Sequence, residues 1–193
     1  MITKETARTG LRELTEGFHL PLERAQRCAL RWAAVEENDR VLDVDCGSGA
    51  LLLDLTNRMR IRACGMCRDW GEARQLREMM DDADVICGKT TDIPFRDDSF
   101  DTVFVTGRTG ENCSMQGLNE IYRVLRPGAQ LIICCHMHPG LKQFLSQYSE
   151  PELDRRTLMR SMQECGFKHI SCRQTGFRGV IIGWKKESFE RQE

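Results

Sequence analysis

The sequence lacks an excess of charge of either sign, and it lacks any long apolar run. Its 28 basic and 29 acidic residues leave a net charge of −1. No cluster of Lys and Arg provides the electrostatic footprint of a nucleic-acid-binding protein. The longest apolar stretches, such as residues 131–135, are far too short to span a membrane. These absences predict that neither nucleic acid nor a membrane is a partner of the chain.

The first ten residues also lack the apolar core of a secretory signal peptide, so we expect a cytoplasmic protein. The sequence contains ten cysteines among 193 residues, a number that would indicate disulfides in a secreted protein. In a cytoplasmic protein we expect reduced thiols instead, most of them buried as small apolar side chains.

No internal repeat, low-complexity tract or linker divides the sequence, and 193 residues is the length of one domain. We therefore expect a single domain over residues 1–193. Its predicted parts are an N-terminal helical segment (1–35), a central core (38–135) and a C-terminal helix with a β-hairpin (136–193).

Segments with the apolar periodicity of helices alternate with short apolar segments that are typical of buried strands. Leu118, Ile121, Tyr122 and Leu125 lie at helical spacing, and the following Pro-Gly pair at 127–128 must end that helix. The predicted helices cover residues 21–35, 50–57, 71–80, 118–125 and 153–165. The predicted strands cover residues 41–45, 61–66, 84–87, 101–105, 130–135, 168–174 and 179–185.

This alternation predicts an α/β fold with a doubly wound, mostly parallel, seven-stranded sheet covered on both faces. The last two strands have no helix between them, so they are expected to form an antiparallel hairpin at one edge. Ligands of such sheets bind at the carboxyl ends of the strands, near the point where the strand order switches. Candidate site residues are therefore those that follow the strands.

A glycine-rich turn, Cys46-Gly47-Ser48-Gly49, joins the first predicted strand to a helix. The two glycines let the backbone approach a ligand closely, and the helix N-terminus offers N–H groups with partial positive charge. A dinucleotide-binding loop would read G-x-G-x-x-G, whereas Leu52 occupies the third glycine position here. The turn suits a carboxylate or a phosphate, and a plain tight turn is the alternative.

Together with Asp43 in the preceding strand, this turn resembles motif I of the class I S-adenosylmethionine-dependent methyltransferases, V-L-D-x-G-C-G-x-G. Two further segments are similar to the same family. Residues 92–101 resemble its L-P-F-x-D-x-S-F-D stretch, and residues 120–128 resemble its E-x-x-R-V-L-K-P-G helix end. The resemblance covers residues 38–135, which would form the cofactor-binding core of a Rossmann-like methyltransferase fold.

The resemblance implies a methyltransferase that binds S-adenosylmethionine and S-adenosylhomocysteine and acts on a small-molecule methyl acceptor. Residues 1–20 would fold over the cofactor as a lid. The cofactor would contact residues in and after the first four strands: Asp43, Asp45, Cys46, Gly47, Ser48, Gly49, Cys67, Arg68, Lys89, Thr90, Thr91, Thr106 and Gly107. The residues at 106–109 differ from the N/D-P-P-Y/F motif of enzymes that methylate nucleic-acid amines, which argues against that substrate class.

Three of these positions depart from the family pattern. Asp45 replaces the first glycine of motif I, where a second carboxylate would repel the methionyl carboxylate unless it pairs with the methionyl ammonium. Cys67 stands where the family places an acid that holds the ribose hydroxyls, and Lys89 stands where an acid accepts from the adenine amino group. Losing both acids would weaken cofactor binding by about a decade or more.

Methyl transfer requires a nucleophile held in line with the methyl group, and a hydroxyl or protonated amine also needs a base. His136 and His138 follow the fifth predicted strand and are the candidate bases, with exposed loop histidines as the alternative. Arg108, Glu111 and Asn112 follow the fourth strand, where contact with substrate and simple solvation are equal alternatives.

Two other functions stay open from the sequence. The first is a non-catalytic protein of the same fold that binds a nucleoside-like ligand or a partner protein. It would explain why Cys67 and Lys89 stand where the family has acids. A thiol-rich protein that handles a metal or metalloid would use the Cys- and His-containing run at 134–138 together with Cys113 or with the Cys64-x-x-Cys67 pair. No second C-x-x-C exists and Cys64 is expected within a strand, so no metal site is predicted.

Overall fold

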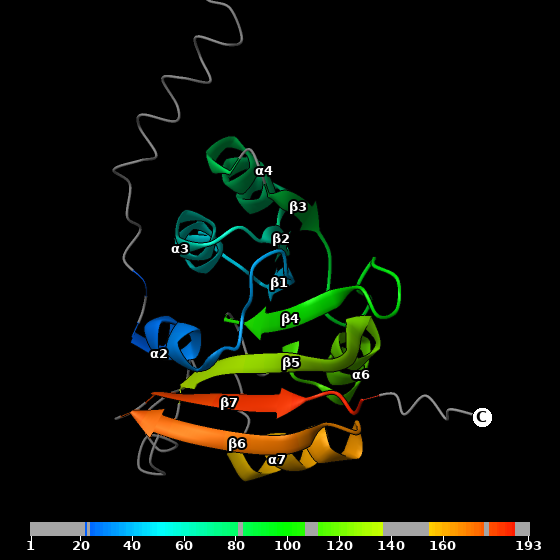
Figure 1. Cartoon of the computed structure of the whole chain (residues 1–193). Helices are drawn as coiled ribbons and strands as arrows, with labels where there is room; N and C mark the ends of the chain where they lie inside the picture. Colours follow the sequence, from blue (N-terminus) through cyan, green and yellow to red (C-terminus); the bar gives the residue numbers. More distant parts are fainter. Residues whose placement is uncertain are drawn as a thin grey trace, which may run out of the picture.

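The computed structural model describes residues 22, 24–80, 83–106, 112–136, 155–175 and 178–187 (Figure 1). These residues form a seven-stranded sheet with the order β3-β2-β1-β4-β5-β7-β6. The strands are β1 (Arg40–Val44), β2 (Arg62–Cys67), β3 (Asp84–Cys87), β4 (Phe100–Val105), β5 (Leu125–His136), β6 (Lys168–Thr175) and β7 (Arg178–Trp184). The helices are α2 (Arg24–Trp32), α3 (Ala50–Arg58), α4 (Trp70–Met79), α6 (Met115–Val124) and α7 (Arg155–Glu164).

The first five strands pair in parallel, whereas β7 is antiparallel to both β5 and β6. From β1 the chain runs outward through β2 to β3, then returns to build β4 and β5 on the other side of β1. The switch in strand order therefore lies between β1 and β4. The predicted fold class, a doubly wound and mostly parallel α/β sheet with an antiparallel C-terminal hairpin, is confirmed.

Two apolar clusters cover the two faces of the sheet. Side chains from α2, α3 and α4 pack with Val41 and Phe104 on one face, while side chains from α6 and α7 pack with Leu42 and Val103 on the other. Successive strand residues alternate between the two clusters, as the two-residue period of a strand requires. Figure 1 shows α3 and α4 beside the β1–β3 end of the sheet, and α7 beside β6. No helix in the described part of the chain is long and apolar enough to cross a membrane.

The boundaries differ from the sequence predictions mainly where α6 meets β5. The helix ends at Val124, because Leu125 already has the extended dihedrals φ −72° and ψ 139°. Pro127 disfavours helical dihedrals in the residue before it, so the chain leaves the helix ahead of the proline. β5 consequently begins at Leu125 rather than at residue 130. The predicted lid (1–20) and the turn at 176–177 lie outside the described residues.

Arg123 joins two of the segments that resemble the methyltransferase family. Its guanidinium donates to both carboxylate oxygens of Glu120, to the carbonyls of Ile93 and Phe95, and to Asp97. Glu120 in turn accepts from the N–H of Ile93 at 2.9 Å, and the Arg123 guanidinium lowers the pKa of its carboxyl group. The loop before β4 is thereby attached to the end of α6, which gives these motif residues a structural role.

Replacing Arg123 with Ala is expected to lower the free energy of unfolding by about 2 kcal/mol, since several partly buried hydrogen bonds lose their donor at once. Urea denaturation measures this loss. Arg126→Ala is the matched control, because Arg126 is half exposed and pairs with Asp101 at the surface, where an ion pair contributes less than about 1 kcal/mol. Equal losses in the two variants would contradict a special role for Arg123.

Candidate active site at the carboxyl edge of the sheet

The glycine turn after β1 has the tight backbone that its sequence predicts. Asp45, Gly47 and Gly49 adopt positive φ values of 57°, 53° and 72°, and the N–H of Gly49 donates to the carbonyl of Cys46 at 2.9 Å. α3 begins directly after this turn, and no described side chain caps its N-terminus. By contrast, the Asp69 carboxylate caps α4 by accepting from the N–H groups of Gly71 and Glu72. The free N–H groups at this edge therefore belong to α3.

Asp43 places a carboxyl group inside the sheet beside this turn. It is fully buried in β1, and its Oδ1 accepts a hydrogen bond from Thr106 Oγ1 at 2.9 Å. Its Oδ2 is buried and has no hydrogen-bond partner among the described residues. Burial in this apolar setting raises the pKa of Asp43 to about 8. When the group is ionised, Oδ2 is a buried acceptor without a donor, which is costly, so the carboxylate is suited to a ligand that donates.

A polar network lies over the ends of the neighbouring strands. Asn112 is buried; its Nδ2 donates to Asp45 at 3.2 Å, and its Oδ1 accepts from Thr90 Oγ1 at 2.7 Å. Arg68 donates to the same Oδ1 at 3.4 Å, and its Nε lies 3.9 Å from Asp45 Oδ1. The carboxylate that replaces the first motif glycine is therefore placed among donors. Asn112 is buried in this network, so its side chain is not simply solvated at the surface, which was one of the two alternatives that the sequence left open.

Two cysteines meet at this edge, a contact that sequence spacing did not reveal. Cys46 Sγ in the turn lies 3.3 Å from Cys67 Sγ at the end of β2, and both side chains are buried. Cys64 packs on the opposite face of the sheet, because residues three apart in a strand point to opposite sides. Cys64 and Cys67 therefore cannot bind one ion together. Among the described residues, no group of three or more His, Cys, Asp or Glu is arranged to hold a metal ion.

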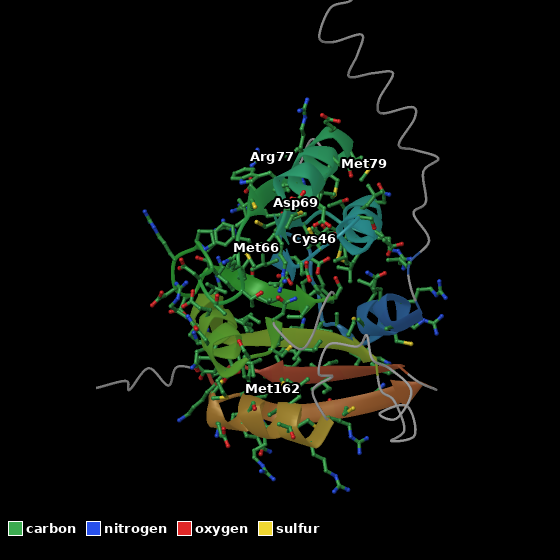
Figure 2. The ribbon with its side chains drawn as sticks, turned by 180° about the vertical axis from the view of Figure 1, so that it is seen from behind. Cys46, Met66, Asp69, Arg77, Met79 and Met162 are labelled. Carbon is green, nitrogen blue, oxygen red and sulfur yellow. The ribbon has the colours of Figure 1, made fainter. Side chains whose placement is uncertain are left out.

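The remaining candidates follow the same strands. Ser48 and Lys89 are exposed, and the carbonyl of Thr91 accepts from Gln116 Nε2 at 3.1 Å. His136 is the last residue of β5, although its side chain is not described, and His138 and Gly107 lie outside the described residues. Cys46 contacts Cys67 at the end of β2, and Asp69 caps the following helix, α4; Figure 2 labels Cys46 and Asp69 in this part of the molecule. The edge thus combines a buried carboxyl group, free helix N–H groups and a polar network.

Comparisons with known proteins identify the family to which the chain is related. Residues 42–133 match the family model described as a methyltransferase domain. A 2-phytyl-1,4-naphtoquinone methyltransferase from Synechococcus elongatus is 34% identical over 140 residues, which cover 67% of this chain and 59% of that protein. A ubiquinone/menaquinone biosynthesis C-methyltransferase from Geotalea daltonii is 32% identical over 64% of this chain and 56% of that protein. The chain therefore spans somewhat more than half the length of these relatives.

Solved structures share the fold at lower identity. An S-adenosylmethionine-dependent methyltransferase from Methanosarcina mazei superposes with a TM-score of 0.70 at 17% identity, covering 88% of this chain and all of that chain. The (4+2)-cyclase SpnF superposes with a TM-score of 0.73 at 16% identity, covering 93% of both chains. The family match, the curated relatives and the fold together show that this chain belongs to the class I S-adenosylmethionine-dependent methyltransferase family.

Proposed function

We propose that the chain is an S-adenosylmethionine-dependent methyltransferase acting on a small-molecule acceptor. The observation that carries this proposal is the unpartnered Oδ2 of Asp43, which is buried beside the turn and the uncapped start of α3. An ammonium group would supply the missing donor to Asp43, and the N–H groups of α3 would bind a carboxylate. An α-amino acid carries both groups on one carbon, and the methionyl end of the cofactor is an α-amino acid.

The nucleoside half of the cofactor would meet different residues from those usual in the family. Cys67 and Lys89 have no carboxylate, so neither offers that acceptor to ribose or adenine; the Cys67 thiol contacts Cys46 Sγ, and Lys89 is exposed. The polar atoms at this part of the edge belong to Arg68, Thr90 and Asn112. We infer that these three residues bind the nucleoside in place of the missing acids.

When bound, the cofactor supplies an activated methyl group on a sulfonium centre. The chain's own contribution is to bind and orient the cofactor and to keep water from the reacting atoms. His136 and His138 remain the candidate bases for an acceptor that must lose a proton. His136 is the last residue of β5, which ends at the same end of the sheet as the turn because β5 runs parallel to β4. His138 is proposed from its place in the sequence alone.

The names of the curated relatives suggest a ring of the naphthoquinone type as the acceptor to test first. The Synechococcus protein is named for a phytyl-naphthoquinone, and a relative from Mycobacterium, 29% identical over 66% of this chain, is named a demethylmenaquinone methyltransferase. We propose the reduced, demethylated naphthoquinone ring as the first acceptor for this chain.

Cys67 and Lys89 favour a second candidate, a non-catalytic member of the family that binds a nucleoside-like ligand. Calorimetry with S-adenosylmethionine and S-adenosylhomocysteine, followed by transfer of a radiolabelled methyl group to a reduced demethylated naphthoquinone, separates the two. Binding with transfer supports the enzyme. Binding without transfer to this or other small acceptors supports the second candidate, and the absence of binding overturns the assignment of the cofactor site.

Lys89→Asp is expected to tighten S-adenosylhomocysteine binding about five- to thirtyfold, because it supplies the acceptor that the adenine amino group lacks. Lys89 is exposed, so the fold should tolerate the change. Lys186→Asp is the matched control, since it makes the same charge change at an exposed position that follows the end of β7. Equal tightening in both variants would indicate a general charge effect, and weaker binding in Lys89→Asp would show that Lys89 already contacts the ligand.

A further inference from the structure

Two buried thiols face each other at the carboxyl ends of neighbouring parallel strands. Cys46 Sγ lies 3.3 Å from Cys67 Sγ, with exposed fractions of 4% and 0% for the two residues. The register of β1 against β2 produces this contact, because the N–H of Cys46 extends the strand pairing by donating to the carbonyl of Met66 at 3.2 Å. A Cβ atom on Gly65 would lie only 3.1 Å from Cys46 Sγ, so a side chain there would press on the thiol.

The two thiols differ in acidity because they share one hydrogen bond. This bond raises the pKa of Cys46, which is also raised by burial, and it lowers the pKa of Cys67. Cys67 is therefore the more acidic of the two thiols and the first candidate nucleophile, and Cys46 is the thiol that donates the shared hydrogen bond. A thiolate is the nucleophile in thiol oxidation, and a second thiol in contact with it resolves the first product.

We propose that Cys46 and Cys67 are a redox modification site, which hydroperoxides convert to a reversible disulfide that weakens cofactor binding. The second half of this proposal rests on the proposed function, since it requires the turn to hold the cofactor. Formation of the disulfide itself depends only on the two sulfur atoms and their surroundings.

The reaction balances with hydrogen peroxide as the oxidant. The Cys67 thiolate attacks one peroxide oxygen, which forms an S–O bond, breaks the O–O bond and releases hydroxide that becomes water. The Cys46 sulfur then attacks the sulfur of the Cys67 sulfenic acid, forming the S–S bond and breaking the S–O bond. The proton of Cys46 leaves with the second hydroxide as water. Two thiols are thus oxidised to one disulfide while one peroxide is reduced to two waters.

The disulfide would change the shape of the turn. An S–S bond is about 2.05 Å long, so the two sulfur atoms must approach by more than 1 Å from their present 3.3 Å. β2 is held by parallel pairing on both sides, so the movement falls mainly on the turn that contains Cys46. The N–H of Gly49 is bonded to the carbonyl of Cys46, so the start of α3 is displaced along with it. These are the groups proposed to bind the methionyl end.

Two other cysteines near Cys67 are alternative disulfide partners, and the structure disfavours both. Cys87 pairs in register with Cys67 across the strands, but its thiol donates to the carbonyl of Arg68 at 3.2 Å. Cys64 lies in the same strand as Cys67 on the opposite face of the sheet. The structure thus predicts a Cys46–Cys67 disulfide rather than Cys67–Cys87 or Cys64–Cys67.

Peptide mapping of the full chain without reduction, after treatment with hydrogen peroxide, tests the linkage directly. The expected product is a Cys46–Cys67 linked peptide that disappears on reduction with dithiothreitol. S-adenosylhomocysteine present during the treatment should slow its formation, because a ligand that binds only the reduced form stabilises that form. The absence of a linked peptide, or linkage of Cys67 to Cys87 or Cys64, would overturn the proposal.

Calorimetry with S-adenosylhomocysteine before peroxide, after peroxide and after re-reduction tests the consequence. We expect the affinity to fall about tenfold or more on oxidation and to recover on reduction. Cys46→Ser should lose this peroxide response, with Cys67 then trapped as its sulfenic acid, whereas Cys64→Ala should keep the response. Unchanged affinity in disulfide-bonded protein would overturn the proposed control. If reduced protein binds no cofactor, the proposed function fails, while peptide mapping still decides whether the disulfide forms.

Discussion

Gly47→Asn is expected to weaken S-adenosylhomocysteine binding by about a hundredfold or more while leaving the protein folded. Gly47 is exposed on the turn with φ 53°, a conformation that Asn adopts more readily than most residues. An added Cβ would meet no described atom within 4 Å beyond its chain neighbours, so the fold has room for the side chain. The same open space is where a ligand bound by the turn would lie, so the Asn side chain would exclude it.

Gly128→Asn provides the matched control for this experiment. Gly128 also has a positive φ, 78°, and a Cβ there would make only an ordinary contact with Glu187 at 3.5 Å. It lies near the amino end of β5, at the opposite edge of the sheet from the turn. Calorimetry and circular dichroism on both variants separate backbone strain from loss of the site. Equal binding by the two folded variants would remove the turn from the cofactor site.

Gly49 is less suited to this test, for a reason that only the structure supplies. A Cβ on Gly49 would lie 2.2 Å from Cδ1 of the buried Leu76 in α4. Gly49→Val would therefore disturb the packing of α4 and could lose binding through unfolding. The sequence gives no reason to treat Gly47 and Gly49 differently. In the structure a side chain at Gly49 would collide with Leu76, whereas a side chain at Gly47 would only enter the open space in which a ligand would lie.

The fold was predictable because its signals are local. Apolar periodicity identified the strands and helices, and the glycine turn of motif I identified where β1 ends. The predicted position of the end of α6 was less exact, because the Pro-Gly pair at 127–128 shows only that the helix must end before it and does not fix its last residue. The helix stops at Val124, where Leu125 turns extended ahead of the proline.

The site was less predictable because its contacts join residues that are distant in sequence. Cys46 and Cys67 are brought together by the register of β1 against β2, whereas spacing drew attention to the Cys64–Cys67 pair. Asn112 is buried because it bonds to Asp45 and Thr90 from two other strand ends. One signal was available in advance: residues that directly follow adjacent parallel strands meet at one edge, and Cys46 and Cys67 both stand there.

Asp43 is expected to make cofactor binding depend on pH between about 6 and 8. Burial raises its pKa to about 8 in the free protein, and only the ionised carboxylate attracts an ammonium group. The affinity for S-adenosylhomocysteine should therefore rise with pH, by up to about tenfold per unit below the pKa. In Asp43→Asn this dependence should vanish and binding should weaken by about a hundredfold at pH 8. Calorimetry at several pH values measures both effects.

The same pKa shift makes an independent prediction for stability. The unfolded chain loses the Asp43 proton near pH 4, while the folded protein keeps it until about pH 8. The folded state thus binds more protons in this window, so the free energy of unfolding should fall as pH rises, by on the order of a few kcal/mol. Asp43→Asn keeps an acceptor for Thr106 and should lack this fall. Thr106→Val should instead extend the fall to higher pH, because the hydroxyl hydrogen bond that lowers the Asp43 pKa is gone. Urea denaturation at pH 5, at pH 8 and above pH 8 compares the three proteins, and parallel behaviour of Asp43→Asn and the unchanged protein would show that Asp43 is ionised throughout this range.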